Sequence, residues 1–151
     1  DYSYSLFLQE FSMVKELLDN DSKVVIISDR SFLGEGVWGK YRNYDGAQLV
    51  KKLMNRSIFN QLLSEISAHF FYDTWARYQT RDDGASMFKN EDEFQECISN
   101  FQAMNRLLLS TANNRKINII TQSYSLEKLT KGSVSESMEY VYDNHFLPTI
   151  V

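Results

Sequence analysis

An acidic and a basic residue stand next to each other at the end of an apolar run. Asp29 and Arg30 directly follow residues 23–28 (KVVIIS). A carboxylate at the end of a strand can hold a divalent metal ion or accept a proton, and a guanidinium can bind a phosphate through two parallel hydrogen bonds. The pair therefore predicts phosphate chemistry at a strand end, although an ordinary ion pair would use the same two residue types.

A glycine-rich segment follows this pair. Residues 34–40 (GEGVWGK) fit the G-x-x-x-x-G-K spacing of a phosphate-binding P-loop. A P-loop follows its strand directly, however, and its lysine precedes a serine or threonine that opens a helix. Here residues 29–33 intervene and Tyr41 takes the place of that hydroxyl residue. The context therefore argues against a P-loop. It argues more strongly against the overlapping G-x-G-x-x-G dinucleotide fingerprint, which requires a strand, a turn and a helix in direct succession.

Apolar periodicity predicts the elements that would position these residues. Residues 23–28 form an unbroken β-branched run, which is typical of a strand buried on both faces in a parallel sheet. Amphipathic spacing and capping residues predict helices on either side of further short apolar runs. The predicted strands are 23–28, 66–72 and 116–121, and the predicted helices are 6–18, 45–54, 58–65, a long one from Asn90 or Asp92, and 135–146 ended by Pro148. This alternation predicts one α/β domain with parallel strands over residues 1–151.

Composition limits the classes of partner. The chain has 151 residues, 43% hydrophobic and 24% charged, and a formal net charge of −4. Such a balance gives no electrostatic reason to bind nucleic acid or an anionic membrane, so neither is an expected partner. The single cysteine, Cys97, cannot form an internal disulfide and fits a reducing cytoplasm. Cys97, His69 and His145 lack partners at metal-ligand spacing, so we interpret all three as structural.

Residues 29–42 resemble the Asp-Arg motif of thymidylate kinase-like P-loop nucleoside monophosphate kinases. The phage-type form of that motif reads D-R-x-x-x-G-E-x-V-[YW]-G-x-x-Y-R, and this chain matches it or nearly matches it at Asp29, Arg30, Gly34, Glu35, Val37, Trp38, Gly39 and Arg42, with one residue fewer before the final Y-R. Arg77 and Arg81 resemble the lid arginines of the same family, while Asp73-Thr74-Trp75 replaces its usual D-P-E. The resemblance covers about residues 5–121.

The resemblance implies a three-layer parallel sheet with helices on both faces and transfer of the ATP γ-phosphoryl to a deoxynucleotide with Mg²⁺. It implies catalytic roles for Asp29, also as a metal ligand, and for Arg30, Arg77 and Arg81, and substrate-binding roles for Phe32, Glu35, Trp38 and Arg42. Four-residue spacing places Arg77 and Arg81 on one face of a helical lid, where they would close over phosphates. The alternatives are an ordinary solvated face for the two arginines and core packing for Trp38.

The segment that should carry the P-loop is not found ahead of this motif. No G-K-[ST] sequence precedes Ser28. In the resembled family the P-loop strand lies between the strands predicted at 23–28 and 66–72, so we expect an N-terminally incomplete domain, a homodimer or second chain that completes the sheet, or a fold that has lost its nucleotide site. A deoxynucleoside kinase and a non-catalytic binding or assembly module remain alternatives. The phage-like motif suggests the cytoplasm of a bacterial or phage-infected cell.

Overall fold

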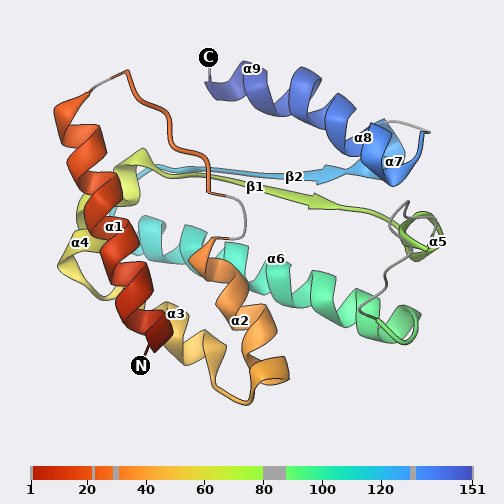
Figure 1. Ribbon diagram of the computed structural model, residues 1–151, viewed down its shortest axis with the longest axis horizontal. Coiled ribbons are helices and arrows are strands. Elements are labelled where there is room, and N and C mark those ends of the chain that lie inside the picture. Colours follow the sequence, from red (N-terminus) through yellow and green to blue (C-terminus); the bar gives the residue numbers. More distant parts are fainter. Residues whose placement is uncertain (1, 22, 29–30, 80–87, 130–131, 151) are drawn as a thin grey trace. The chain divides into compact units, whose positions relative to one another are not determined.

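The computed structural model describes residues 2–21, 23–28, 31–79, 88–129 and 132–150. It is mostly helical and contains a two-stranded parallel sheet, which is a mixed α/β composition (Figure 1). The chain divides into two compact units, which are described separately. The first contains residues 1–68 and 100–120, and the second contains residues 69–99 and 121–151. The prediction of one domain over the whole chain stays a prediction.

Helix α1 (Tyr2–Asn20) supplies one wall of the core of the first unit. Its apolar residues recur every three or four positions, so they share one face. Phe11 is buried at the centre of that face, where its ring packs edge-on against Phe32 at 5.3 Å and tilted against Phe59 at 5.9 Å. Aromatic contacts of this geometry contribute about 0.5–1.5 kcal/mol each beyond simple burial. The predicted first helix is therefore confirmed, with its core face.

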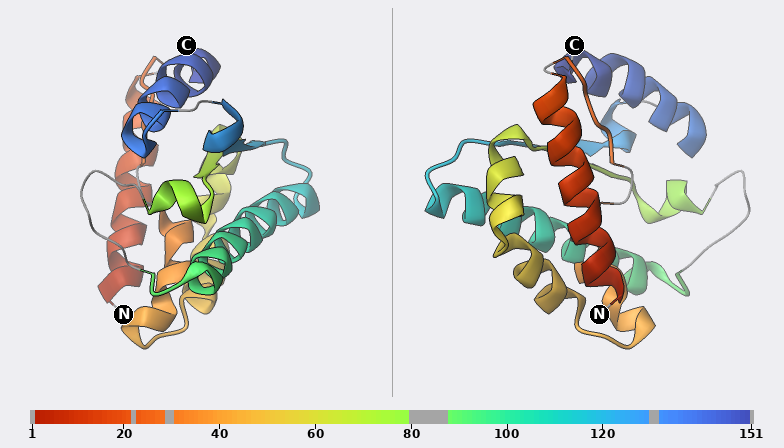
Figure 2. Two further views of the ribbon diagram at one scale, coloured as in Figure 1. Left: turned by 90° about the vertical axis from the view of Figure 1, so that its right-hand side faces the viewer. Right: turned by 60° about the vertical axis from the view of Figure 1, so that its left-hand side comes forward.

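The buried strand predicted at residues 23–28 is wrong. This segment leaves the end of α1 and turns back beside it, where the Ser28 hydroxyl lies 3.5 Å from Glu10 (Figure 2). The backbone is extended, but it joins no sheet within the described part of the chain. Val25, Ile26 and Ile27 are between 38% and 56% exposed. A β-branched run favours extended backbone, but burial requires a neighbouring strand that the pattern alone does not specify.

The glycine-rich segment is helical. After Ser31, the chain forms η1 (Phe32–Gly34), α2 (Glu35–Trp38) and η2 (Gly39–Arg42), and then α3 (Gly46–Met54), α4 (Ser57–Leu62) and η3 (Leu63–Glu65). Gly34 and Gly39 have right-handed helical φ angles of −60° and −55°. A Cβ atom on Gly39 would lie 2.6 Å from the backbone nitrogen of Gly46. Gly39 therefore permits close backbone packing, and the segment is helical rather than a phosphate-binding loop.

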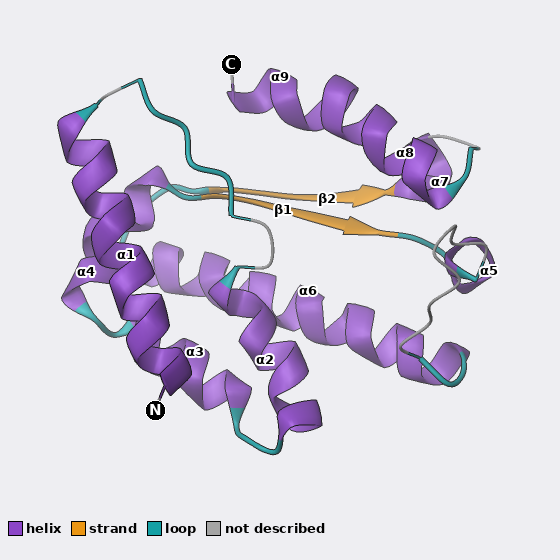
Figure 3. Cartoon of the chain, in the orientation of Figure 1, coloured by secondary structure: helices purple, strands orange, loops and turns teal. Residues whose placement is uncertain are grey.

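Strands β1 (Ser67–Tyr72) and β2 (Ile120–Ser125) lie side by side and point the same way (Figure 3). The strand predicted at 66–72 is confirmed. The strand predicted at 116–121 starts later, because Lys116 adopts a left-handed φ of 59° and Ile117 and Ile119 pack against the core of the first unit. Core packing thus uses the first part of the apolar run, and the strand begins at its end.

Helix α6 (Glu91–Asn114) begins where its capping residues predict. The Asn90 side chain accepts a hydrogen bond of 2.9 Å from the Glu93 backbone N–H, and the Glu93 carboxylate accepts one of 3.2 Å from the Lys89 N–H. This reciprocal pattern is close to a capping box, which satisfies N–H groups left open at a helix start. The α6 residues buried along its length are Phe94, Cys97, Leu108 and Ala112.

Replacing Asn90 with alanine is expected to lower the free energy of unfolding by about 1 kcal/mol, because the Glu93 N–H loses its side-chain acceptor. Urea denaturation followed by circular dichroism measures this change. Asn113→Ala, in the exposed last turn of the same helix, serves as the control and should change stability by less than about 0.5 kcal/mol. Equal effects of the two substitutions would contradict a capping role for Asn90.

The C-terminal helical segment consists of α7 (Leu126–Leu129), α8 (Val134–Val141), the π-helical turn η4 (Tyr142–Phe146) and α9 (Leu147–Ile150). The predicted helix 135–146 exists, but Pro148 does not end it. The Leu147 N–H bonds to the Tyr142 carbonyl, five residues back, so the helix continues through a π-helical turn into α9. Pro148 thus stands where the hydrogen-bond pattern changes from π-helical to α-helical. No helix within the described ranges is long and apolar enough to cross a bilayer.

Candidate functional site

A glutamate and an arginine meet in the first unit, in a corner formed by α2, η2 and the start of α3. Glu35 opens α2 and Arg42 ends η2. The Arg42 Nη1 lies 3.5 Å from the Glu35 Oε1, and the arginine side chain is 61% exposed while the glutamate is 13% exposed. The carboxylate is therefore fixed inside the corner, and most of the guanidinium remains open to bind a second anion.

Trp38 lies one turn after Glu35 on the same helix. Its ring packs edge-on against Phe101 at 5.8 Å and tilted against Tyr41 at 5.7 Å. The ammonium of Lys40 lies 5.1 Å from the centre of the Tyr41 ring, within cation–π range. The corner thus places aromatic rings and cations beside the Glu35–Arg42 pair, and packing on Phe101 accounts for much of the position of Trp38.

Phe32 occupies the core of the first unit. Its ring is buried, edge-on to Phe11 at 5.3 Å and edge-on to Phe59 at 5.5 Å. Packing alone explains this position. Its predicted contact with a nucleoside stays a prediction, and the structure places Phe32 among core residues, whereas Glu35, Trp38 and Arg42 lie in the corner.

Two buried oxygen atoms of the corner have no hydrogen-bond partner among the described residues. They are the Glu35 Oε2 and the Tyr44 hydroxyl. Buried oxygens without partners are uncommon and often indicate a water molecule, an ion or a ligand group. Sequence reasoning missed Tyr44, because a tyrosine ahead of the capping residue Asp45 carries no pattern of its own.

A second group of polar residues lies in the second unit, after β1. The Asp73 carboxylate accepts hydrogen bonds from the Thr74 N–H at 2.8 Å and from the Arg77 Nε at 3.0 Å. Arg77 also donates to the Ser137 hydroxyl in α8. Thr74 caps the short helix α5 (Trp75–Tyr78), which carries Arg77. The strand end, α5 and α8 are therefore joined through one mostly buried guanidinium.

This network limits what Arg77 can do in the observed state. A charge-assisted pair with a buried carboxylate holds the guanidinium in one orientation. An arginine that clamps a phosphate would have to exchange that carboxylate for the ligand. Ser137 lies in the helix predicted at 135–146, but nothing in its sequence surroundings predicts an arginine partner.

The remaining predicted catalytic residues, Asp29, Arg30 and Arg81, lie outside the described residues. Over the described ranges, no three histidine, cysteine, aspartate or glutamate side chains form a group that could hold a metal ion. This statement does not extend to the predicted magnesium ligand Asp29, which lies outside the described residues. The described residues therefore provide no test of magnesium or ATP binding.

A chain of polar contacts joins the two strands in the second unit. The His69 Nδ1 lies 2.9 Å from the Tyr124 hydroxyl, which donates to the Gln122 side-chain oxygen. The imidazole and phenol rings stack at 5.8 Å, and Phe146 packs edge-on against the imidazole at 4.8 Å. Burial lowers the pKa of His69 and raises the pKa of Tyr124. In both rings burial favours the neutral form over the charged one.

Comparisons of the chain with protein-family models, curated proteins and solved structures found no match.

Proposed function

We propose that the chain is a thymidylate kinase-like nucleoside monophosphate kinase that transfers the ATP γ-phosphoryl to a deoxynucleotide. The proposal includes the three-layer parallel sheet of that family and rests on its Asp-Arg motif. The observation that carries it is the corner in which Glu35 and Arg42, seven residues apart, approach to 3.5 Å beside Trp38. A carboxylate, an exposed guanidinium and an indole together suit a base and a phosphate. The parallel pairing of β1 and β2 is also the kind of strand pairing expected in that family's sheet.

The residues of this chain would act by positioning charge. In phosphoryl transfer the transferred group carries charge on its oxygens, so cations and orientation lower the barrier. Arg42 would bind the acceptor phosphate, and the Glu35 Oε2 would accept a hydrogen bond from the base or sugar. Arg30 would also hold the acceptor phosphate, and Asp29 would hold Mg²⁺. When bound, magnesium would neutralise phosphate charge.

A coupled assay tests this function with ATP, magnesium and a panel of nucleosides and nucleoside monophosphates. Turnover of a deoxynucleoside monophosphate is the expected result. Arg42→Gln should raise the KM for that acceptor about tenfold, because it removes one exposed charged contact worth roughly 1.4 kcal/mol. Arg56→Gln replaces another exposed arginine, at the start of α4, and should leave the KM unchanged.

Preference for nucleosides over monophosphates would instead support the deoxynucleoside kinase alternative. The absence of turnover with every acceptor, from folded full-length protein, would reject both kinases. An unchanged KM in Arg42→Gln would show that the corner does not bind the acceptor. The kinase assignment would then depend only on whether the protein turns over a deoxynucleotide.

A non-catalytic binding or assembly module is the second candidate. The exposed run of residues 25–27 favours it, because extended apolar backbone that pairs with no strand of the described part of the chain is a template for pairing with another chain. A homodimer or a second chain would then complete the sheet. The cytoplasmic setting in a bacterial or phage-infected cell belongs to the same proposal and rests on the phage-like motif.

A further inference from the structure

Helix α1 carries apolar side chains on its outer face as well as on its core face. The core face is the one on which Phe11 is buried. On the outer face, four apolar residues have exposed fractions of 77%, 44%, 64% and 50%: Tyr2, Leu6, Met13 and Leu17. Their spacings of about four, seven and four residues place them along one side of an α-helix, and they form the outer stripe of α1. A surface helix ordinarily has polar residues on that side, and exposed apolar patches often mark interaction sites.

Acidic residues border the outer stripe. At about 3.6 residues per turn, Glu10 lies beyond one edge of the stripe and Glu16 lies beyond the other. The sequence of α1 contains one basic residue, Lys15, and its ammonium pairs with the Asp19 carboxylate at 2.5 Å. The surroundings of the outer stripe are therefore negatively charged.

We propose that the outer stripe of α1 binds an amphipathic helix of a partner protein, with apolar residues along one face and lysine or arginine residues beside them. Helices pair in this way through residues spaced three, four and seven positions apart. Charged residues beside such a seam select the partner, because opposite charges attract across it and like charges repel. Glu10 and Glu16 would therefore meet basic side chains of the partner helix.

A second copy of this chain suits the outer stripe less well. Two stripes packed together would bring Glu10 and Glu16 of both copies to one seam, and the lysine of α1 already pairs with Asp19. The stripe is also narrow. Four side chains on a helix of 19 residues, about 28 Å long, offer less area than the roughly 1,200–2,000 Å² that stable complexes bury. We therefore expect a transient complex with a basic helix and not a stable dimer.

Fluorescence anisotropy with two labelled synthetic peptides and the full chain tests the proposal. Both peptides consist of three heptads with leucine at the a and d positions, and they carry either lysine or glutamate at the e and g positions. The lysine peptide should bind at least about tenfold more tightly at low salt, since its charges complement Glu10 and Glu16. Glu16→Gln should reduce this difference.

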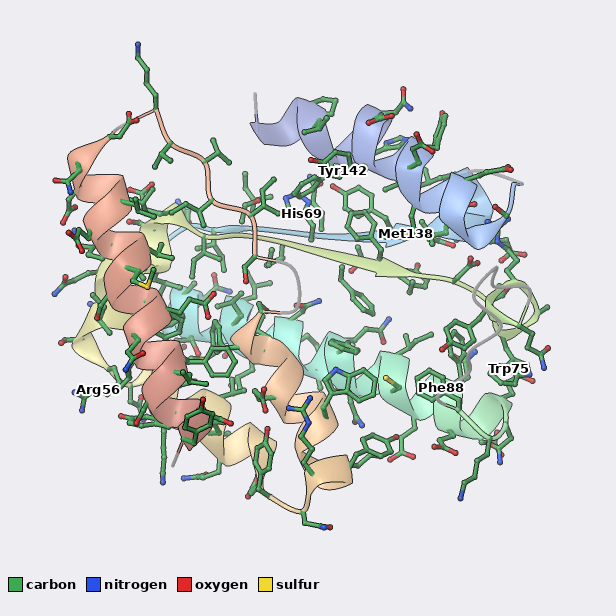
Figure 4. All side chains as sticks on the ribbon, in the orientation of Figure 1. Arg56, His69, Trp75, Phe88, Met138 and Tyr142 are labelled. Atoms are coloured by element: carbon green, nitrogen blue, oxygen red, sulfur yellow. The ribbon has the colours of Figure 1, made fainter. Side chains whose placement is uncertain are left out.

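Two double variants separate binding to the stripe from general attraction between a basic peptide and an acidic protein. Met13→Gln/Leu17→Gln keeps every charge and introduces good helix formers at exposed positions, so the protein should fold while its affinity for the lysine peptide falls about tenfold. Met138→Gln/Tyr142→Gln is the matched control and should bind as the wild type does. Its two residues are four positions apart on the C-terminal helical segment and are 41% and 43% exposed (Figure 4).

Equal binding of the two peptides would overturn the proposal of a basic partner. Unchanged affinity in Met13→Gln/Leu17→Gln, or an equal loss in Met138→Gln/Tyr142→Gln, would show that the outer stripe is not the binding surface. A wild-type dimer in sedimentation equilibrium that becomes monomeric in Met13→Gln/Leu17→Gln would assign the stripe to a second copy of the chain. Since the readout is binding and not turnover, none of these results bears on the kinase assignment.

Discussion

Replacing Arg77 with methionine is expected to lower the free energy of unfolding by about 3 kcal/mol. The substitution keeps most of the side-chain volume and removes the guanidinium that bonds to Asp73 and Ser137. Asp73 would then remain buried with one N–H donor, from Thr74. Breaking a buried ion pair from one side typically costs about 3–5 kcal/mol, because the remaining charge loses its compensation. Arg77 is partly exposed, so we expect the low end of that range.

Urea denaturation of three variants separates this effect from loss of an ordinary arginine. Arg106→Met changes an exposed arginine on α6 and should shift stability by less than about 0.5 kcal/mol. Asp73→Asn should be destabilising alone, and the Asp73→Asn/Arg77→Met double variant should lose less than the sum of the single losses by at least about 1 kcal/mol. Additive losses would show that the two side chains do not stabilise the fold as a pair.

The same variants address what Arg77 does in the proposed kinase. An arginine that only joins β1 to α8 should lower stability without changing the KM or kcat of the protein that remains folded. An arginine that also contacts a phosphate should reduce turnover at temperatures where the variant is fully folded. The resemblance predicts the second behaviour, and the contact with Asp73 holds the side chain in the observed state.

The spacing of apolar residues correctly predicted those elements in which the sequence of the element alone shows which face is buried. Helix α1, strand β1 and helix α6 each have apolar residues spaced so that they share one face. Strand β1 and helix α6 begin next to their predicted first residues, and helix α1 begins earlier than predicted, at Tyr2 instead of residue 6. The predictions failed where packing against residues far away in the sequence determines the local structure. Residues 23–28 would form a buried strand only beside a neighbouring strand, and the described sheet contains β1 and β2 alone. Ile117 packs against the core of the first unit, so β2 begins after it. Pro148 follows a π-helical turn, and no pattern of side chains predicts such a turn, so the predicted helix end at Pro148 was wrong.

The candidate site was predictable to a similar extent. The motif grouped Glu35, Trp38 and Arg42, and the structure brings these three into one corner because helical turns close the spacing between them. The partners Tyr44, Tyr124 and Ser137 could not be predicted, since each acts through a contact between separate elements. Their residue types are common, and only the fold shows which polar atom lies within hydrogen-bond distance of another.

The corner itself depends on a glycine, so its replacement should have a large effect on stability. Gly46 is buried at the start of α3, and a Cβ atom there would overlap the Glu35 carbonyl oxygen and lie 2.6 Å from the Glu35 carbonyl carbon. Backbone atoms cannot rotate aside as a flexible side chain can. Gly46→Ala therefore requires α2 and α3 to separate, and we expect it to lower the free energy of unfolding by at least about 3 kcal/mol.

Two other glycines of the first unit provide the comparison for Gly46→Ala. A Cβ atom on Gly34 would lie 3.6 Å from the Trp38 ring, an ordinary contact, so Gly34→Ala should leave stability within about 1 kcal/mol of wild type or raise it slightly. A Cβ atom on Gly36 would meet the Met104 side chain, which can move. Gly36→Ala should therefore lower the free energy of unfolding by an amount between those of the other two variants. Denaturation midpoints that fall in the order Gly34, Gly36, Gly46 would support this packing. If Gly46→Ala were as stable as Gly34→Ala, α2 and α3 could not pack as closely as observed, and Glu35 would not be held in the corner by that contact.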